Sequence, residues 1–124
     1  MLNTAKIVAF VPIRDSQRSR TFYEGALGLQ FISDDPFALV MNANGTIVRL
    51  AKGANFTPAG FTVLGWEVSA IEEAVSALQK KGVVFEQFPG MEQDKLGIWA
   101  APGGAKVAWF KDPDGNILSL SQHT

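Results

Sequence analysis

Few side chains in this sequence are able to perform acid–base, nucleophilic or metal chemistry. The chain has no cysteine and a single histidine, His123, next to the C-terminus. A thiolate nucleophile is therefore excluded, no serine–histidine–carboxylate arrangement is expected, and a histidine at a chain end is typical of a solvated tail. No glycine-rich segment follows a strand and opens a helix, so a phosphate-binding loop is not expected either.

Two charged residues lie within strand-like segments. Strand alternation places Glu67 and Arg49 on the faces that look away from the helices, the side of a possible cavity. There Glu67 would serve as a general base and Arg49 would stabilise an anionic intermediate. Because an unpaired buried charge is costly, an inward Arg49 would indicate an anionic ligand group or an acidic partner. The alternative is that Arg49 lies near the strand end and reaches water.

Large aromatic side chains are the other candidates for ligand contact. Trp66, Trp99 and Trp109 could each stack on an organic molecule, or could belong to the core or to a dimer interface. The alternation that assigns Glu67 to the cavity side assigns Trp66 to the helix side.

The segment Asp112-Pro113-Asp114-Gly115-Asn116 predicts a three-residue hairpin loop, because proline suits a type I turn and glycine the left-handed residue after it. This loop fixes the register of the flanking strands. Trp109 faces Ser119 on a mixed face, and Phe110 faces Leu118 on an apolar face suited to packing under a helix. The mixed face is the candidate cavity wall.

The elements that position these residues occur twice. A helix over 17–27 is expected after an N-cap at Asp15 or Ser16 and before Gly28, and the capping box Ser69–Glu72 opens a second helix that ends at Gly82. Each helix follows one strand and precedes several. The predicted strands are 6–12, 30–33, 37–41, 46–51, 61–68, 83–87, 98–101, 105–111 and 117–121.

Composition indicates one globular domain over residues 1–124, with a first module of about 1–52, a linker 53–59 and a second module of about 60–124. The chain is 47% apolar and has 11 basic against 12 acidic residues without clustering, so nucleic acid is not an expected partner. No segment reads as a membrane span or signal peptide. With no cysteine, the cytoplasm is the expected location.

Several motifs together give a family resemblance. They are Arg14-Asp15, Arg18-Ser19, Phe22-Tyr23-Glu24, Leu27-Gly28-Leu29, Lys81-Gly82-Val83 and Phe110 to Asn116. With these the chain resembles, over nearly its whole length, the vicinal oxygen chelate superfamily of glyoxalases, bleomycin-resistance proteins and extradiol dioxygenases. The resemblance implies an α+β fold in which two βαβββ modules form a curled, U-shaped mixed sheet with the helices outside. It also implies a homodimer.

Metal-dependent members of that superfamily bind their ion through one His or Glu from each of four strands. The resemblance places those positions at Val8, Arg49, Val63 and Ser119, none of which is a usual ligand of a divalent ion. No metal and no other cofactor is therefore expected, and metal-dependent glyoxalase or dioxygenase chemistry is not predicted.

The function predicted is the metal-independent binding of a small organic molecule in the sheet cavity. The expected lining is Phe10, Arg49, Glu67, Trp99, Trp109 and Ser119, closed by the long loop 88–104 if that loop is a lid. One alternative is a metal-independent lyase or isomerase that uses Glu67 and Arg49. The other is a module that has lost its ligand.

Overall fold

The computed structural model describes residues 1–123, and the chain divides into two compact units, Met1–Thr57 and Pro58–Thr124. Each unit has its own sheet and its own helical segment. We refer to them as the first unit and the second unit.

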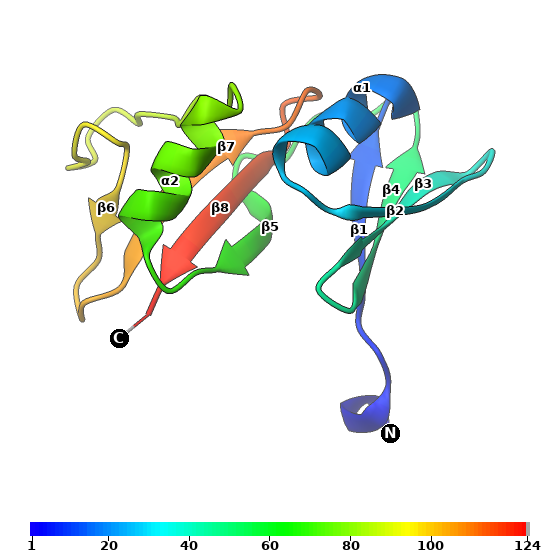
Figure 1. Cartoon of the computed structure of the whole chain (residues 1–124), viewed down its shortest axis with the longest axis horizontal. Coiled ribbons are helices and arrows are strands. Elements are labelled where there is room, and N and C mark those ends of the chain that lie inside the picture. The colour runs from blue at the N-terminus through cyan, green and yellow to red at the C-terminus, as the bar shows by residue number, and fades with distance from the viewer. Residues whose placement is uncertain (124) are drawn as a thin grey trace. The chain divides into compact units, whose positions relative to one another are not determined.

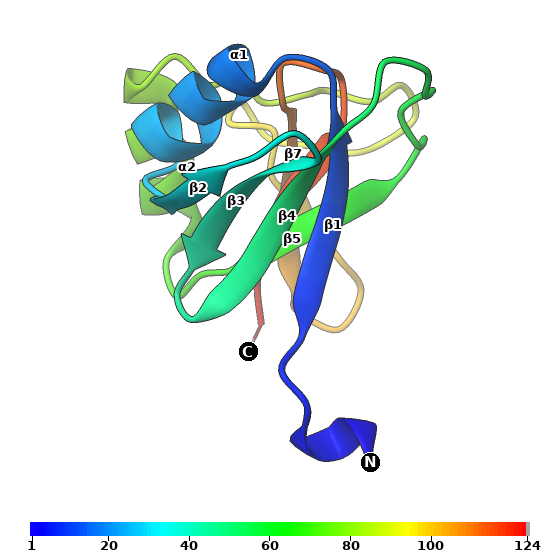
Figure 2. The ribbon, with the colours of Figure 1, turned by 90° about the vertical axis from the view of Figure 1, so that its right-hand side faces the viewer.

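The first unit has four strands in the order β1-β4-β3-β2, with β1 parallel to β4 and the other pairs antiparallel (Figure 2). Its elements are η1 (Leu2–Thr4), β1 (Val8–Ile13), α1 (Ser16–Arg20), η2 (Thr21–Ala26), β2 (Gln30–Asp34), β3 (Ala38–Ala43) and β4 (Thr46–Lys52). α1 and η2 lie on one face of this sheet. The strand β1 forms one of its edges.

The second unit repeats that plan with the order β5-β8-β7-β6. Its elements are β5 (Thr62–Glu67), α2 (Ile71–Lys80), β6 (Trp99–Ala100), β7 (Lys106–Lys111) and β8 (Ile117–Gln122), and α2 packs against β7 and β8 (Figure 1). The parallel pair is again the first strand with the last. Two four-stranded, open, mixed sheets with identical strand order confirm the predicted α+β fold of two βαβββ modules.

The helix-facing side of each sheet forms its core. In the first unit Val11, Leu39, Met41 and Leu50 are fully buried, and in the second unit Ala108, Phe110 and Leu118 are. These residues alternate along their strands, so the opposite face of each sheet carries the intervening side chains. No helix of the described residues is long and apolar enough to cross a membrane.

The start of the first helix is as predicted. The Asp15 carboxylate Oδ1 accepts hydrogen bonds from the backbone N–H of Gln17 (2.9 Å) and Arg18 (3.2 Å). Beyond Arg20 the helix widens, and the N–H of Leu27 bonds to the C=O of Phe22 in a π-helical turn. The helix ends at Gly28, whose φ of 79° is a left-handed conformation that glycine adopts without strain.

The capping box predicted for the second helix is wrong. The N-cap residue is Ala70, and no side chain of this segment caps the helix. Instead the Gln122 side chain on β8 accepts a hydrogen bond from the N–H of Ile71 (2.8 Å). A partner distant in sequence satisfies the helix terminus, so the local Ser69–Glu72 motif is not needed for that purpose.

The strand predicted at 83–87 is also wrong. Only an isolated bridge pairs Phe85 with Phe110, whereas β6 pairs Trp99 with Val107. Both pairings use the same side of β7, so the edge position next to β7 is shared by two short segments. Residues 88–98 leave the sheet between them. We call this segment the insertion.

The terminal hairpin has the predicted register, with Trp109 opposite Ser119 and Phe110 opposite Leu118. Asp112 stabilises the loop, because its Oδ1 accepts from the N–H groups of Asp114 and Asn116 and its Oδ2 accepts from the Asn116 amide (2.8 to 2.9 Å). Both Asp112 and Asn116 are buried.

Candidate functional site

The face of the second sheet that looks away from α2 carries the candidate site. Trp109 and Ser119 form a cross-strand pair there, and Trp99 on β6 lies opposite Val107 on the same face. Trp109, Trp99 and Ser119 are all partly buried. The sequence prediction for this face, a mixed set containing Trp109 and Ser119, is confirmed by the register.

A pocket of about 220 Å³ opens on this face beside Trp109. It is formed by the start of β5, the beginning of β8 and the insertion. Its lining residues are Gly60, Phe61, Thr62, Phe88, Met91, Trp109 and Ile117. The lining is apolar and aromatic apart from the Thr62 hydroxyl, and it includes no ionisable side chain.

A tight turn at the start of the insertion explains two of these lining residues. The N–H of Met91 donates to the C=O of Phe88 (3.2 Å), with Pro89 and Gly90 between them and a φ of 81° at Gly90. Proline followed by glycine with positive φ fits a type II turn. Because such a turn brings its first and fourth residues together, Phe88 and Met91 reach the same pocket.

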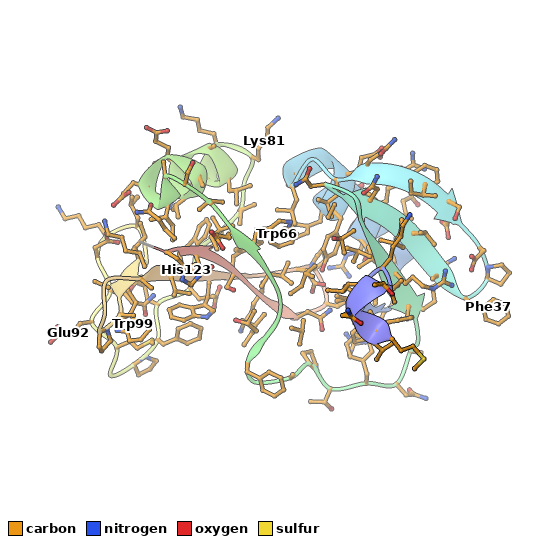
Figure 3. The ribbon with its side chains drawn as sticks, turned by 90° about the horizontal axis from the view of Figure 1, so that it is seen from below. Phe37, Trp66, Lys81, Glu92, Trp99 and His123 are labelled. Carbon is orange, nitrogen blue, oxygen red and sulfur yellow. The ribbon has the colours of Figure 1, made fainter. Side chains whose placement is uncertain are left out.

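Two aromatic rings, those of Phe88 and Trp99, contact the Trp109 ring. The Phe88 ring lies edge-on to it, with centroids 5.6 Å apart and an interplanar angle of 82°, and the Trp99 ring is 6.1 Å away at 34°. Figure 3 shows Trp99 at the insertion and Trp66 apart from it on β5. Separations of this size are favourable for aromatic pairs. The pocket wall is thus a packed aromatic cluster.

The insertion is held by its own hydrogen bonds. The Asp94 Oδ1 accepts from the N–H groups of Leu96 and Ile98, both at 2.9 Å. The Gln93 amide bonds to three backbone groups, those of Phe88, Glu86 and Gly97. The segment is therefore a structured wall.

Trp66 packs against the core of the second unit and is itself partly buried. It lies on the helix-facing side of β5, opposite Leu120, and its ring stacks on Phe110 with centroids 6.4 Å apart and an angle of 19°. Of the three tryptophans considered from the sequence, Trp109 lines the pocket, Trp99 contacts the Trp109 ring without lining the pocket, and Trp66 lies on the other side of the sheet.

Away from the pocket, this face carries small and polar residues along β5 and the end of β8. Gly65 lies opposite Ser119, and Glu67 opposite Ser121 at the far end of β5. A methyl group at Gly65 would lie 2.7 Å from the Ser119 Oγ, so the Ser119 side chain would have to move to accept a larger residue there. Glu67 is exposed, and His123 is exposed with its Nε2 3.1 Å from the Ser121 Oγ.

Phe10 and Arg49 are neighbours on the first sheet, on the face away from α1, as the alternation predicts. Phe10 is 64% exposed and Arg49 is partly buried. Arg49 has an acidic neighbour in the same unit. The N–H groups of Phe37 and Ala38 donate to Asp35 and hold the pKa of its carboxyl below the usual range, and the charge of Arg49 lowers it further.

The four positions that the family resemblance assigns to metal ligands carry side chains that do not suit a divalent ion. Val8 and Val63 offer no coordinating atom, Arg49 is cationic, and Ser119 offers only a hydroxyl. Val63 is also the extra residue of a bulge between Thr62 and Leu64, so simple alternation does not fix its direction. Within residues 1–123 no group of three or more His, Cys, Asp or Glu side chains could hold an ion.

Sequence reasoning missed Phe61, Thr62, Phe88, Met91 and Ile117 as lining residues. Phe88 was expected only as the start of a loop. A signal was present, because Phe88 and Met91 flank a Pro-Gly turn in a segment otherwise rich in polar residues and glycine, and such residues in a loop usually pack against something.

The sequence profile of the Glyoxalase/Bleomycin resistance protein/Dioxygenase superfamily matches residues 5–120. The chain belongs to this superfamily. A search of curated proteins gave no match.

Solved structures agree with this assignment. A superfamily member from Sphaerobacter thermophilus DSM 20745 is 25% identical with a TM-score of 0.73, covering 99% of this chain and 100% of that one. TnmS3, an antibiotic binding protein from Streptomyces sp. CB03234, is 24% identical with a TM-score of 0.72, covering 100% and 99%. A lactoylglutathione lyase from Agrobacterium tumefaciens is 13% identical with a TM-score of 0.73, covering 96% and 93%. One fold thus serves both a binding protein and a lyase, so the site must indicate the function.

Proposed function

We propose that this superfamily member binds a planar aromatic organic molecule, without a metal ion and without converting it, in the pocket of the second unit. The observation that carries the proposal is the lining of that pocket, in which Trp109, Phe88 and Phe61 surround a space of about 220 Å³ without an ionisable group. Apolar aromatic walls with one hydroxyl favour stacking over chemistry.

The volume limits what the pocket holds. Pockets for drug-sized ligands span roughly 300–1,000 Å³, and a cavity of about 150 Å³ accepts benzene. The space beside Trp109 therefore suits one or two fused rings. A larger molecule would place such a portion in the pocket and extend over the polar surface around Ser119.

Charge supports binding over conversion. Glu67 is exposed, and neither Glu67 nor Arg49 is among the residues that line the pocket. A general base and an anion-stabilising group work best in contact with the ligand and where water is excluded. The similarity to TnmS3, an antibiotic binding protein, agrees with binding as the function.

The test is a titration with 2-naphthol, a neutral two-ring probe, in which tryptophan fluorescence reports binding. The titration is carried out with and without EDTA. We expect saturable binding that EDTA leaves unchanged. Trp109→Ala should weaken it at least about tenfold, because it removes the central ring of the cluster. Phe37→Ala, which truncates an exposed aromatic residue of the first unit, is the matched control and should leave the affinity unchanged.

Two results would overturn this proposal. Loss of binding on metal removal would show that an ion takes part. Absence of saturation with 2-naphthol and with a panel of larger planar aromatics would indicate a module without a ligand.

We also propose that two copies of the chain associate. The edge strand β1 and the residue before it expose Ile7, Val8 and Phe10, and an exposed apolar edge is a surface that proteins usually cover. Light scattering should give twice the mass of the 13.4 kDa chain, and Phe10→Asp should halve it. A wild-type mass equal to one chain would refute this association.

A further inference from the structure

Gln93 lies in the middle of the insertion and does not line the pocket. Its side chain nevertheless makes three short hydrogen bonds to the backbone. The Oε1 accepts from the N–H of Phe88 (2.7 Å), and the Nε2 donates to the C=O of Glu86 (2.9 Å) and to the C=O of Gly97 (2.7 Å). A carboxamide is the only uncharged side-chain group that can accept one hydrogen bond through its oxygen and donate two through its nitrogen in this way.

These three bonds join the two ends of the insertion. Glu86 and Phe88 follow the bridge between Phe85 and β7, and Gly97 lies two residues before the start of β6. The contact at Gly97 is close, since a methyl group there would lie 3.3 Å from the Phe85 Cβ and 3.4 Å from the Glu86 oxygen. Gln93 thus ties together two segments that are separated in sequence and adjacent in space.

Both ring neighbours of Trp109 are attached to these ends. The Phe88 N–H donates directly to the Gln93 side chain, and Trp99 follows Gly97 by two residues and pairs with Gln93 through a backbone bridge. We infer that Gln93 is the positioning residue of the aromatic pocket, which fixes Phe88 and Trp99 against Trp109 before any ligand arrives. This inference rests on the proposed function of the pocket.

The chemistry of the amide makes the role specific. Alanine at this position would leave one N–H and two C=O groups without partners. Glutamate would keep the acceptor for Phe88 but, when ionised, would place a negative charge against two carbonyl oxygens. A protonated carboxyl could donate to one of those carbonyls again. Glutamate should therefore act as a pH-dependent replacement, and alanine should not.

A pocket that is only partly formed binds more weakly in proportion to its formed fraction. For Gln93→Ala we expect a dissociation constant for 2-naphthol raised about tenfold. We also expect faster amide hydrogen exchange over residues 88–98 and broadened indole N–H signals of Trp99 and Trp109 in the ligand-free protein. Gln79→Glu, on the exposed side of α2, is the control and should change none of these.

Gln93→Glu supplies the sharper test, because the affinity of one and the same variant is compared at two pH values. At about pH 7.5 its affinity should be reduced as in Gln93→Ala, and at about pH 5 it should recover, because a carboxyl beside two carbonyl oxygens gains its proton above the ordinary glutamate pKa of about 4.3. Gln93→Ala and the wild type should show no such recovery. If the alanine variant does not fold, this pH profile still decides the question.

Wild-type affinity in both Gln93 variants would overturn the inference, as would affinity loss in Gln93→Glu with no change between the two pH values. Failure of the proposed function is distinguishable. If wild-type protein does not bind 2-naphthol, the hydrogen-exchange and line-width measurements on the ligand-free protein still test whether Gln93 holds the insertion in place. Unchanged exchange over residues 88–98 in Gln93→Ala would then refute its role.

Discussion

The two units share one strand order and differ at the edge next to their third strand. In the first unit β2 follows Gly28 almost at once and pairs along β3 with a single bulge. In the second unit the corresponding edge is divided between Phe85 and β6, and the insertion leaves the sheet between them. The continuous edge strand of the first unit leaves no segment to cover the sheet face. The interrupted edge of the second unit releases the insertion, which forms the pocket together with the start of β5 and the beginning of β8.

The second unit has buried side-chain hydrogen bonds in addition to exposed ion pairs. In the first unit the Asp15 cap, the Arg20–Glu24 pair and the Lys52–Asp34 pair are solvent-exposed or nearly so. In the second unit Asp112 and Asn116 are buried, and Gln93 is partly so. Buried polar groups are costly to leave unpaired, so the second unit should be the more sensitive to loss of a single partner.

The largest effect is expected for Asp112→Ala. It removes the acceptor of the Asp114 and Asn116 N–H groups and of the buried Asn116 amide, and it should lower the free energy of unfolding by about 3 kcal/mol. Urea denaturation measures this. Asp15→Ala in the first unit loses an exposed cap and should cost only about 1 kcal/mol. Equal losses would mean that the burial of these contacts does not matter.

The next effect tests how closely β5 and β8 approach. Gly65→Ala should destabilise the protein by about 2 kcal/mol, because the new methyl group would lie 2.7 Å from the Ser119 Oγ. At Gly25 in the first unit a methyl group would meet nothing within 4 Å, so Gly25→Ala should not destabilise it. The double variant Gly65→Ala with Ser119→Ala should recover much of the loss. Simple additivity of the two changes would contradict a direct clash.

The smallest effect concerns exposed carboxylates. A hydrogen bond from Lys52 lowers the pKa of Asp34, and one from Lys106 lowers the pKa of Glu72 in the second unit. A carboxyl with a depressed folded-state pKa stabilises the fold above its unfolded pKa and loses that contribution as the pH falls through the folded value. At pH values below about 4, the urea concentration at the midpoint of unfolding should therefore decrease slightly. The decrease should be smaller in Asp34→Asn than in the wild type. An identical pH dependence in Asp34→Asn would exclude this contribution.

Local sequence predicted the parts of the second unit that depend on local chemistry. The turn at Asp112–Asn116 determines which residues of β7 and β8 face each other, so Trp109 and Ser119 could be assigned to one face from the sequence. The Asp15 cap and the glycine stops at Gly28 and Gly82 were predicted for the same reason.

What the sequence did not predict depends on partners distant along the chain. Gln122 caps α2 from the end of β8, and no motif near Ser69 reveals it. The conformation of the insertion depends on Gln93 and on packing against Trp109, so periodicity offers no signal for it. The predicted sites at Phe10, Arg49 and Glu67 remain predictions, whereas Trp109 lines the pocket and Trp99 adjoins it.

The most direct measurement is an amide and indole NMR titration of the wild-type protein with 2-naphthol. If the pocket of the second unit binds planar aromatic molecules, the indole N–H signals of Trp99 and Trp109 shift saturably, and the signal of Trp66, on the core side of β5, does not. Saturable shifts confined to the first unit, around Phe10 and Arg49, would show that the binding surface lies there instead.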